Sequence, residues 1–496
     1  MNRHATLGFL NKENSCDCFC IKKLSLLYYK ILLAYNTRVM ANFVKNLIPE
    51  GLLKAVRPWY HGFLAWDANL YFDRPSERLI VIGITGTAGK STTAAMLSHI
   101  LNNAEGRGNG LQSRKDAERP WKCGYITTVD FFDGSRHFLN KHGLSMPNEI
   151  KLQKQLHAMA VNKCKYAIIE CTSEGLAQNR HWGINFDMAV FTNLSNAHLE
   201  AHGGFENYRQ AKIRLFAGLG KSRKKKFFPQ KMIGVNLDDK TADKFLSFPA
   251  DKKFGVSFGR LEGGDAQKVF YGNLIKRGIP AEFQINSVPF TLNLPGNFNV
   301  QNAGLAAACA EMLGVDLAKS SEALKSFSGV RGRMESVPNG RGIKIIVDYG
   351  CEPASFKAAL EAAGQMPHNK LIHVFGSTGG HRDIAKRFEF GKTSAQFADR
   401  IIVTNDDVYE SDPQKIANDI ESGIRNYELR KPLYEIILDR RQAIHRALSI
   451  AQPNDIVLIT GKGSEQFLVL PGNKRVEWDD ASVVREDLQK MEIKGN

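Results

Sequence analysis

A glycine-rich loop at residues 83–92, GITGTAGKST, holds the residue types that bind the phosphates of a nucleotide. The glycines that let its backbone N–H groups turn toward one point are Gly83, Gly86 and Gly89. Lys90 would reach the β- and γ-phosphates, and the hydroxyl of Ser91 would be a ligand of Mg²⁺. The spacing departs from the pattern G-x-x-x-x-G-K, because Ile84 stands where the first glycine belongs. The loop therefore predicts a nucleotide site of a variant kind.

The residues on either side of the loop predict the elements that position it. The apolar, β-branched run at 79–82 predicts a buried strand. The stretch TTAAMLSHIL at 92–101 follows, and it predicts a helix with one apolar face. The residues of that face are Ala94, Leu97, Ile100 and Leu101. The positive end of this helix would add to the attraction for phosphate.

Two further β-rich runs end in polar residues that could meet the loop. These runs are 166–170 and 187–192, and we expect them to be strands of an α/β sheet. In such sheets ligands gather at the carboxyl ends of the strands. Glu170 therefore lies where a carboxylate would meet the magnesium ion, and Asn193 and His198 follow the next strand.

The chain predicts three regions. Residues 1–78 form an atypical N-terminal segment, 79–330 a central ATP-binding domain with a parallel-rich sheet, and 331–496 a Rossmann-like α/β domain. The strands expected in the third region are 343–349, 371–377, 400–406 and 455–461.

The N-terminal region differs from the rest in composition. Its apolar run at 24–35 is too short to span a membrane, and Met40 offers a second start, so we interpret residues 1–39 as a dispensable extension. The aromatic stretch 41–72 predicts a helix packed on the domain. The alternative is an interfacial membrane helix flanked by Lys54 and Arg57, which would make weak contact with a membrane surface.

Charge and cysteine content narrow the class of protein. A net charge of +16 favours anionic partners, which include nucleic acid, phosphorylated substrates and anionic membranes. Much of the excess is local, as in KSRKKK at 221–226, a run typical of a solvated loop. The eight cysteines do not predict a disulfide framework in so long a chain. Cys16, Cys18 and Cys20 alternate, without the two-residue gap of common zinc pairs, and the others are scattered, which predicts a reducing, cytoplasmic location.

Several ordered motifs over residues 79–480 resemble those of the Mur ligase family, and within it the UDP-N-acetylmuramoyl-tripeptide synthetase (MurE-like) branch. The motifs are GTAGKS (86–91), ECTSEGLAQNR (170–180), FTNLSNAHLEAHG (191–203), LPGNFNVQNAGLAAA (294–308), GRME (332–335), VDYGCEP (347–353) and GKGSE (461–465).

The resemblance implies a set of site residues. The implied catalytic residues are Lys90, Lys212 and Arg333. The implied ATP-binding residues are Gly86, Thr87, Gly89, Lys90, Ser91, Thr92, Asn299, Asn302, Arg333 and Asp348. The implied magnesium ligands are Ser91, Glu170, His198 and, if carbamylated, Lys212. The implied substrate-binding residues are Ser145, Met146, Thr172, Arg180, Asp406, Asp407, Tyr409, Gly461 and Glu465.

The resemblance also implies an activity. ATP would phosphorylate the carboxylate of a UDP-N-acetylmuramoyl-dipeptide, and the amine of an amino acid would then displace the phosphate to form an amide. The implied cofactors are ATP and Mg²⁺. The enzyme would act as a monomer in the cytoplasm, with no nucleic-acid partner.

Four departures from the family pattern stand out. In members that add diaminopimelate, an arginine holds the distal carboxylate, and Tyr409 stands in its place. A neutral phenol cannot form that bidentate ion pair, so diaminopimelate would not be favoured through this contact. Ser145 and Met146 replace paired threonines, and Cys351 replaces a histidine. The 1–78 segment does not read as the UDP-binding domain that family members usually carry.

Two alternatives use the same loop. Another ligase of the superfamily, similar to folylpolyglutamate or cyanophycin synthetases, would use the same ATP chemistry on a different acceptor. A P-loop ATPase acting on nucleic acid would exploit the basic charge, but no aromatic and basic strand-binding pattern recurs along the chain.

Overall fold

The computed structural model describes residues 50–104, 122–141, 146–195, 203–259, 264–380 and 384–495. The chain separates into two compact units, Met1–His61 and Gly62–Asn496. Helix α3 (Glu50–Tyr71) begins in the first unit and ends in the second. All other elements below belong to the second unit.

The first sheet has eleven strands in the order β11-β10-β9-β8-β7-β6-β1-β5-β2-β3-β4. They are β1 (Ile80–Thr85), β2 (Cys123–Ile126), β3 (Asp130–Phe132), β4 (His137–Leu139), β5 (Tyr166–Glu170), β6 (Met188–Phe191), β7 (Met232–Asn236), β8 (Lys252–Ser257), β9 (Lys268–Lys276), β10 (Ala281–Ile285) and β11 (Val288–Leu292). The strands from β9 to β2 pair in parallel, whereas β10, β11, β3 and β4 pair antiparallel at the two edges. The predicted strands at 79–82, 166–170 and 187–192 are confirmed as β1, β5 and β6.

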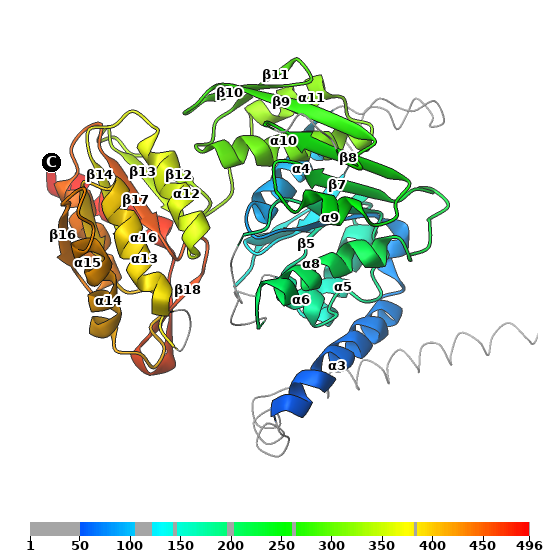
Figure 1. Ribbon diagram of the computed structural model, residues 1–496, viewed down its shortest axis with the longest axis horizontal. Helices are drawn as coiled ribbons and strands as arrows, with labels where there is room; N and C mark the ends of the chain where they lie inside the picture. Colours follow the sequence, from blue (N-terminus) through cyan, green and yellow to red (C-terminus); the bar gives the residue numbers. More distant parts are fainter. Residues whose placement is uncertain are drawn as a thin grey trace, which may run out of the picture. The chain divides into compact units, whose positions relative to one another are not determined.

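Helices cover both faces of this sheet (Figure 1). One face packs against α4 (Lys90–Asn103), α10 (Asn297–Met312) and α11 (Leu317–Lys325). The other packs against α5 (Glu149–Val161), α6 (Ser173–Ala177), α8 (Phe205–Leu219) and α9 (Ala242–Leu246). Because strand side chains alternate, Ile80 and Ile82 of β1 lie in the first core and Val81 in the second. The four apolar residues predicted for one face of α4 are all buried in the first core.

The register of β1 places the phosphate loop beside its partners. Ile84 pairs with Glu170 of β5, and Thr85 pairs with Phe191 of β6. The carboxyl ends of these three strands are therefore level with one another. The loop and the segments after β5 and β6 meet there.

A second sheet follows, in the order β12-β13-β17-β14-β15-β16. Its strands are β12 (Glu335–Val337), β13 (Lys344–Asp348), β14 (Leu371–Phe375), β15 (Arg400–Val403), β16 (Leu433–Ile436) and β17 (Ile456–Thr460). All pairs are parallel except β12 with β13. The four strands predicted in this region are confirmed as β13, β14, β15 and β17, and with them the α/β fold class.

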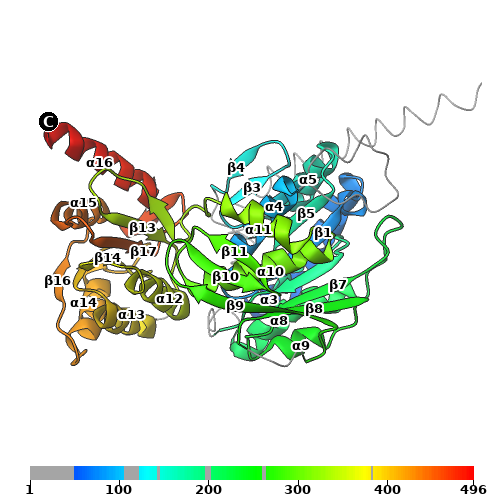
Figure 2. The same ribbon diagram turned by 90° about the horizontal axis from the view of Figure 1, so that it is seen from above.

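Helices also cover both faces of the second sheet (Figure 2). They are α12 (Pro353–Gly364), α13 (Ile384–Phe397) and α14 (Pro413–Arg425) on one face, and α15 (Arg440–Ile450) and α16 (Asp480–Gly495) on the other. Strands β18 (Phe467–Leu470) and β19 (Lys474–Glu477) form a separate two-stranded sheet. The short 3-10 helix η1 (Pro75–Arg78) precedes β1, and η2 (Pro471–Asn473) precedes β19. The predicted domain boundaries at residues 78 and 330 stay predictions.

The basic run 221–226 is not wholly a solvated loop, and the prediction is wrong for Lys225. This side chain is 1% exposed and ion-pairs with the buried carboxylate of Asp187, while its Nζ also donates to Leu79 O at 2.6 Å. Lys231 Nζ lies 3.3 Å from Oδ1 of the same carboxylate. Oδ2, the oxygen that pairs with Lys225, also accepts a hydrogen bond from Val81 N at 2.9 Å. Burial raises the pKa of Asp187, and the two lysines oppose that shift. The run therefore anchors the starts of β1 and β6.

The helix predicted in the aromatic stretch 41–72 is confirmed as α3. Ala65 and Ala68 are buried, and a Cβ at Gly62 would lie 2.6 Å from the Trp182 ring, so this face of the helix packs on the domain. None of the helices in the described ranges is long and apolar enough to cross a membrane.

A buried histidine makes the stability of the second sheet depend on pH. His373 of β14 is fully buried, with Nδ1 2.8 Å from Ser394 Oγ and Nε2 3.0 Å from Thr460 Oγ1. Burial lowers its pKa to about 3. Because the unfolded chain binds this proton first, the free energy of unfolding falls as pH drops from about 6.5 toward 3.

When the pH is lowered from about 7.5 to about 5.5, we expect the burial of His373 to lower the free energy of unfolding by about 1.4 kcal/mol. In His373→Gln this part of the loss should be absent, as measured by urea unfolding at both pH values. His445→Gln is the control, because its imidazole is 56% exposed. An equal loss in His373→Gln and the unchanged protein would contradict the assignment.

Candidate active site

The loop geometry requires glycine at two positions. Gly86 has φ 155° and Gly89 has φ 81°. A Cβ at Gly86 would lie 1.9 Å from Thr192 Oγ1, and one at Gly89 would lie 2.3 Å from Asn302 Oδ1. Asn193 holds the loop from β6, since its backbone oxygen accepts from Thr87 N at 2.8 Å and its Oδ1 accepts from Ala88 N at 2.9 Å.

Glu170 lies at the centre of the site. Its Oε2 accepts from Ser91 Oγ at 2.7 Å and from Thr128 N at 2.8 Å, and its Oε1 accepts from Thr128 Oγ1 at 2.8 Å. Both carboxylate oxygens are therefore held from one side by Thr128. The carboxylate and the Ser91 hydroxyl are hard oxygen donors of the kind that bind Mg²⁺ together with phosphate and water.

Lys90 stands beside this carboxylate. Its Nζ donates to Thr87 O at 2.8 Å and lies 3.9 Å from Glu170 Oε1. Burial lowers the pKa of Lys90, the Glu170 charge opposes this, and the positive charge of Arg333 lowers it further. Arg333 follows the first sheet in the chain, and its charge acts on Lys90.

Lys212 of α8 is buried beneath the loop. Its Nζ donates to Gly86 O at 2.7 Å and lies 4.3 Å from the centre of the Tyr208 ring. Burial, and then the nearby Lys90 charge, hold the pKa of Lys212 well below its usual value. A neutral amine is the form that adds CO₂, so the environment suits the predicted carbamylation, which stays a prediction.

The resemblance to the Mur ligases implies that Asn299 and Asn302 contact adenine, and both lie in the first turns of α10. Asn299 Nδ2 donates to Pro295 O at 2.8 Å, and Asn302 Nδ2 donates to Asn299 Oδ1 at 3.2 Å. Asn302 also approaches Gly89 of the loop, as described above. The structure thus joins α10 to the loop, and the contact with adenine stays a prediction.

The remaining predicted ATP-binding residues, Arg333 and Asp348, lie around β13 of the second sheet. Asp348 accepts from Met334 N at 2.8 Å and from Gly350 N at 2.7 Å, and burial raises its pKa while the Arg333 charge opposes the shift. The Arg333 guanidinium lies 4.3 Å from the centre of the Tyr349 ring. Asp348 therefore orders the backbone that presents Arg333.

A group of charged residues gathers at the carboxyl ends of β15 and β17. Lys462 is fully buried; its Nζ donates to Asp407 Oδ1 at 2.8 Å and also to Glu465. Tyr349 donates to the other oxygen of Glu465 at 3.4 Å. Asp406 adds a third carboxylate, and Gly461 (φ 112°) leaves room for it, since a Cβ there would lie 2.5 Å from Asp406 Oδ2. Tyr409 follows in a left-handed conformation, with φ 52°.

The other predicted substrate residues lie near α6. Thr172 caps that helix by accepting from Gly175 N at 3.3 Å, and Arg180 donates to Met146 O at 2.8 Å. The Met146 side chain is buried in the second core of the first sheet. Ser145 and His198 lie outside the described residues.

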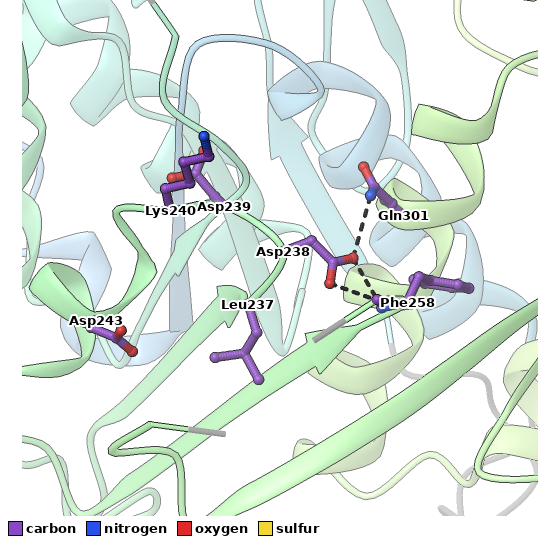
Figure 3. A pocket seen from close by; sticks show the side chains of 8 residues that line it. Leu237, Asp238, Asp239, Lys240, Asp243, Phe258 and Gln301 are labelled. Atoms are coloured by element: carbon purple, nitrogen blue, oxygen red, sulfur yellow. Dashed lines mark hydrogen bonds between the residues drawn. The ribbon is translucent and has the colours of Figure 1, made fainter. Parts of the chain in front are cut away.

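A groove of about 700 Å³ opens at the carboxyl ends of β7 and β8, beside α10. Its lining residues are Leu237, Asp238, Asp239, Lys240, Asp243, Phe258, Gly259 and Gln301. Figure 3 shows Asp238 between Gln301 and Phe258, with hydrogen bonds to both. Asp239 accepts from Leu194 N at 2.6 Å, so the groove adjoins the segment that holds the phosphate loop.

Sequence reasoning missed three residues that the structure brings into the site. They are Thr128, Tyr208 and Lys462. Tyr208 precedes Lys212 by one helical turn, and Lys462 lies inside the GKGSE motif, so spacing offered a signal for both. Thr128 gives no local signal of this role, and only the fold shows that it bonds to Glu170.

We expect Thr128→Val to weaken the binding of MgATP by about 10- to 100-fold, because it frees one oxygen of the central carboxylate. Thr128→Ser should restore most of the affinity. Thr127→Val is the matched control, because the Thr127 hydroxyl donates to Asp130 instead. Calorimetric titration of MgATP, and of ATP without magnesium, measures the effect. An unchanged affinity in Thr128→Val would contradict the role given to Thr128.

Comparison with known proteins matches this arrangement. Residues 84–310 match the Mur ligase middle domain, and residues 332–463 match the Mur ligase, glutamate ligase domain. The chain is 33% identical over 440 residues to the UDP-N-acetylmuramoyl-L-alanyl-D-glutamate–2,6-diaminopimelate ligase of Clostridioides difficile (strain 630), covering 86% of this chain and 82% of that protein. It is 32% identical to the UDP-N-acetylmuramyl-tripeptide synthetase of Borreliella afzelii (strain PKo), covering 87% and 81%.

Solved structures agree. A UDP-N-acetylmuramoyl-L-alanyl-D-glutamate–2,6-diaminopimelate ligase superimposes with a TM-score of 0.55 at 28% identity, over 84% of this chain and 79% of that one. The MurF ligase from Thermotoga maritima in complex with ADP shares the fold, with a TM-score of 0.56 at 18% identity, over 88% of this chain and 85% of that one. The chain belongs to the Mur ligase family.

Proposed function

We propose that this Mur ligase uses ATP to join an amino acid to the carboxylate of a UDP-N-acetylmuramoyl-dipeptide in peptidoglycan precursor synthesis. The observation that carries the proposal is the arrangement around Lys90, where Glu170 and the charge of Arg333 accompany the phosphate loop. The names of the two curated relatives support the choice of acceptor.

The residues suit transfer of a phosphoryl group to a carboxylate. Such a transfer needs charge stabilisation and alignment more than covalent help from the protein. Lys90 and Arg333 offer positive charge to the γ-phosphate, and the N–H groups of the loop hold the other phosphates. The amine of the amino acid then attacks the acyl phosphate. The carbonyl carbon of the acyl phosphate forms the new C–N bond with this amine. Its C–O bond to the phosphate group breaks, and phosphate leaves.

Magnesium fits the donors that are present. Ser91 and Glu170 would supply two oxygen ligands, and we assign His198 and carbamylated Lys212 as further protein ligands. Among the described residues, no group of three or more His, Cys, Asp and Glu side chains could hold a metal by itself. Phosphate oxygens would therefore complete the shell, and the metal would neutralise charge on the transferred group.

The groove beside α10 is our candidate place for the ribose and base of ATP. Its carboxylates repel phosphate and accept hydrogen bonds from hydroxyl and amino groups, and Phe258 offers an aromatic edge. It adjoins the loop through Asp239 and Leu194. Asn299 and Asn302 would then close the nucleoside from the side of α10.

We assign the three regions as predicted, and a monomeric enzyme in the cytoplasm. The Thr127 and Thr128 hydroxyls are bonded within the protein. Uridine recognition would therefore use other groups, with Arg180 and Thr172 as candidates near the acceptor.

ATP turnover should appear only when UDP-N-acetylmuramoyl-dipeptide and an amino acid are both present. We expect Lys90→Met to lower the rate by about 10³-fold, since it removes a charge that faces the transferred phosphoryl group. Release of ADP, measured with each component omitted in turn, is the test. Turnover stimulated by nucleic acid, or failure with every muramyl acceptor, would contradict the proposal.

The charge of the group near β15 and β17 bears on which amino acid is added. Among the described residues of this group, Asp406, Asp407 and Glu465 bring three carboxylates against the ammonium of Lys462. The guanidinium of Arg440 is already engaged with Asp480 at 2.7 Å. An excess of negative charge favours a side chain that ends in an ammonium group over one that also carries a carboxylate.

We expect lysine or ornithine to give a higher kcat/KM than meso-diaminopimelate in side-by-side ligation assays. Tyr409→Arg should raise the use of diaminopimelate by about 10- to 100-fold, because it restores a bidentate partner for the distal carboxylate. Tyr409→Phe is the matched control and should leave the preference unchanged. A clear preference of the unchanged enzyme for diaminopimelate would refute this reading of Tyr409.

A further inference from the structure

Helix α3 carries an exposed apolar face. Phe63, Trp66 and Leu70 are 62%, 53% and 36% exposed. Their spacing of three and four residues places them on one side of the helix. Trp59, one turn earlier, has the same phase and is 69% exposed.

This face is not the one that packs on the domain. The buried residues Ala65 and Ala68 and the close contact of Gly62 with Trp182 lie on another side of the helix. The helix is therefore apolar on two sides, and only one of them contributes to the core. An aromatic strip of this kind on a surface is typical of a docking site.

We propose that the exposed face of α3 docks on an anionic membrane surface. Tryptophan, tyrosine and phenylalanine are the side chains that reside at the boundary between headgroups and acyl chains. No helix of the described residues spans a membrane, so the contact is peripheral.

The charge of the preceding chain selects the anionic surface. Residues 1–49 contain seven Lys and Arg against two Asp and Glu, and the whole chain has a net charge of +16. Basic segments next to an amphipathic helix are attracted by anionic headgroups. The same charge disfavours a second copy of the chain on this face, because dimerisation through α3 would bring two basic segments together.

Docking through α3 leaves the active site open. The helix precedes the amino end of β1, while the phosphate loop follows the carboxyl end of that strand. The contact of Gly183 with Asn69 likewise lies before β6 begins. Membrane binding and ligation would thus take place at opposite ends of the strands, and they can be tested separately.

The test is sedimentation of the full chain with vesicles of phosphatidylcholine and phosphatidylglycerol, compared with phosphatidylcholine alone. We expect binding to the mixed vesicles at low salt, loss at high salt, and quenching of tryptophan fluorescence by brominated lipids. Phe63→Ser and Trp66→Ser should each weaken binding by about tenfold, with ATP turnover unchanged.

Leu429→Ser is the matched control, since Leu429 is 89% exposed in the C-terminal part of the chain. It should bind vesicles as the unchanged protein does. Three results would overturn the proposal: a full chain that stays in solution with the mixed vesicles, serine variants that bind as tightly as the control, or a dimer in light scattering that Trp66→Ser converts to monomer.

Discussion

The site depends on the parallel register of β1 with its two neighbours. Because Ile84 lies opposite Glu170 and Thr85 opposite Phe191, the loop after β1 begins level with the residues that follow β5 and β6. A slip of one residue would turn Glu170 to the other face of the sheet. The register is held at the other end of β1 by Asp187, which accepts from Val81 N and pairs with two buried lysines. A cluster far from the chemistry thus sets the position of the chemistry.

Much of this fold could be predicted from sequence, because buried parallel strands are continuous apolar runs. The runs 166–170 and 455–461 are of this kind, and they became β5 and β17. The strands at the edges of the first sheet were harder to predict. In β9, the exposed lysines at both ends and the partly exposed residues between them give only a weak apolar pattern. Its antiparallel pairing with β10 cannot be read from composition, because only the fold sets the register of the two strands.

The site shows the same division. The phosphate loop and Glu170 could be named because each stands directly after an apolar run. The hydrogen bond of Thr128 to Glu170 could not be predicted, because the two residues are 42 positions apart and only the sheet brings them together. The burial of Lys225 could not be predicted for a related reason. A run of charges usually faces water, and no local pattern reveals that the partner of Lys225 is the buried carboxylate of Asp187, 38 residues earlier in the chain.

The charges around the loop have a consequence for the enzyme without substrate. Burial lowers the pKa of Lys90 and of Lys212, and a neighbouring positive charge lowers each further, that of Arg333 for Lys90 and that of Lys90 for Lys212. Glu170 offsets only part of this repulsion. A nucleoside triphosphate is therefore also a counterion, which turns mutual repulsion between the loop and Arg333 into attraction to a common anion. Nucleotide binding would stabilise the folded protein as well as load the site, and release of the anion would loosen the same contacts.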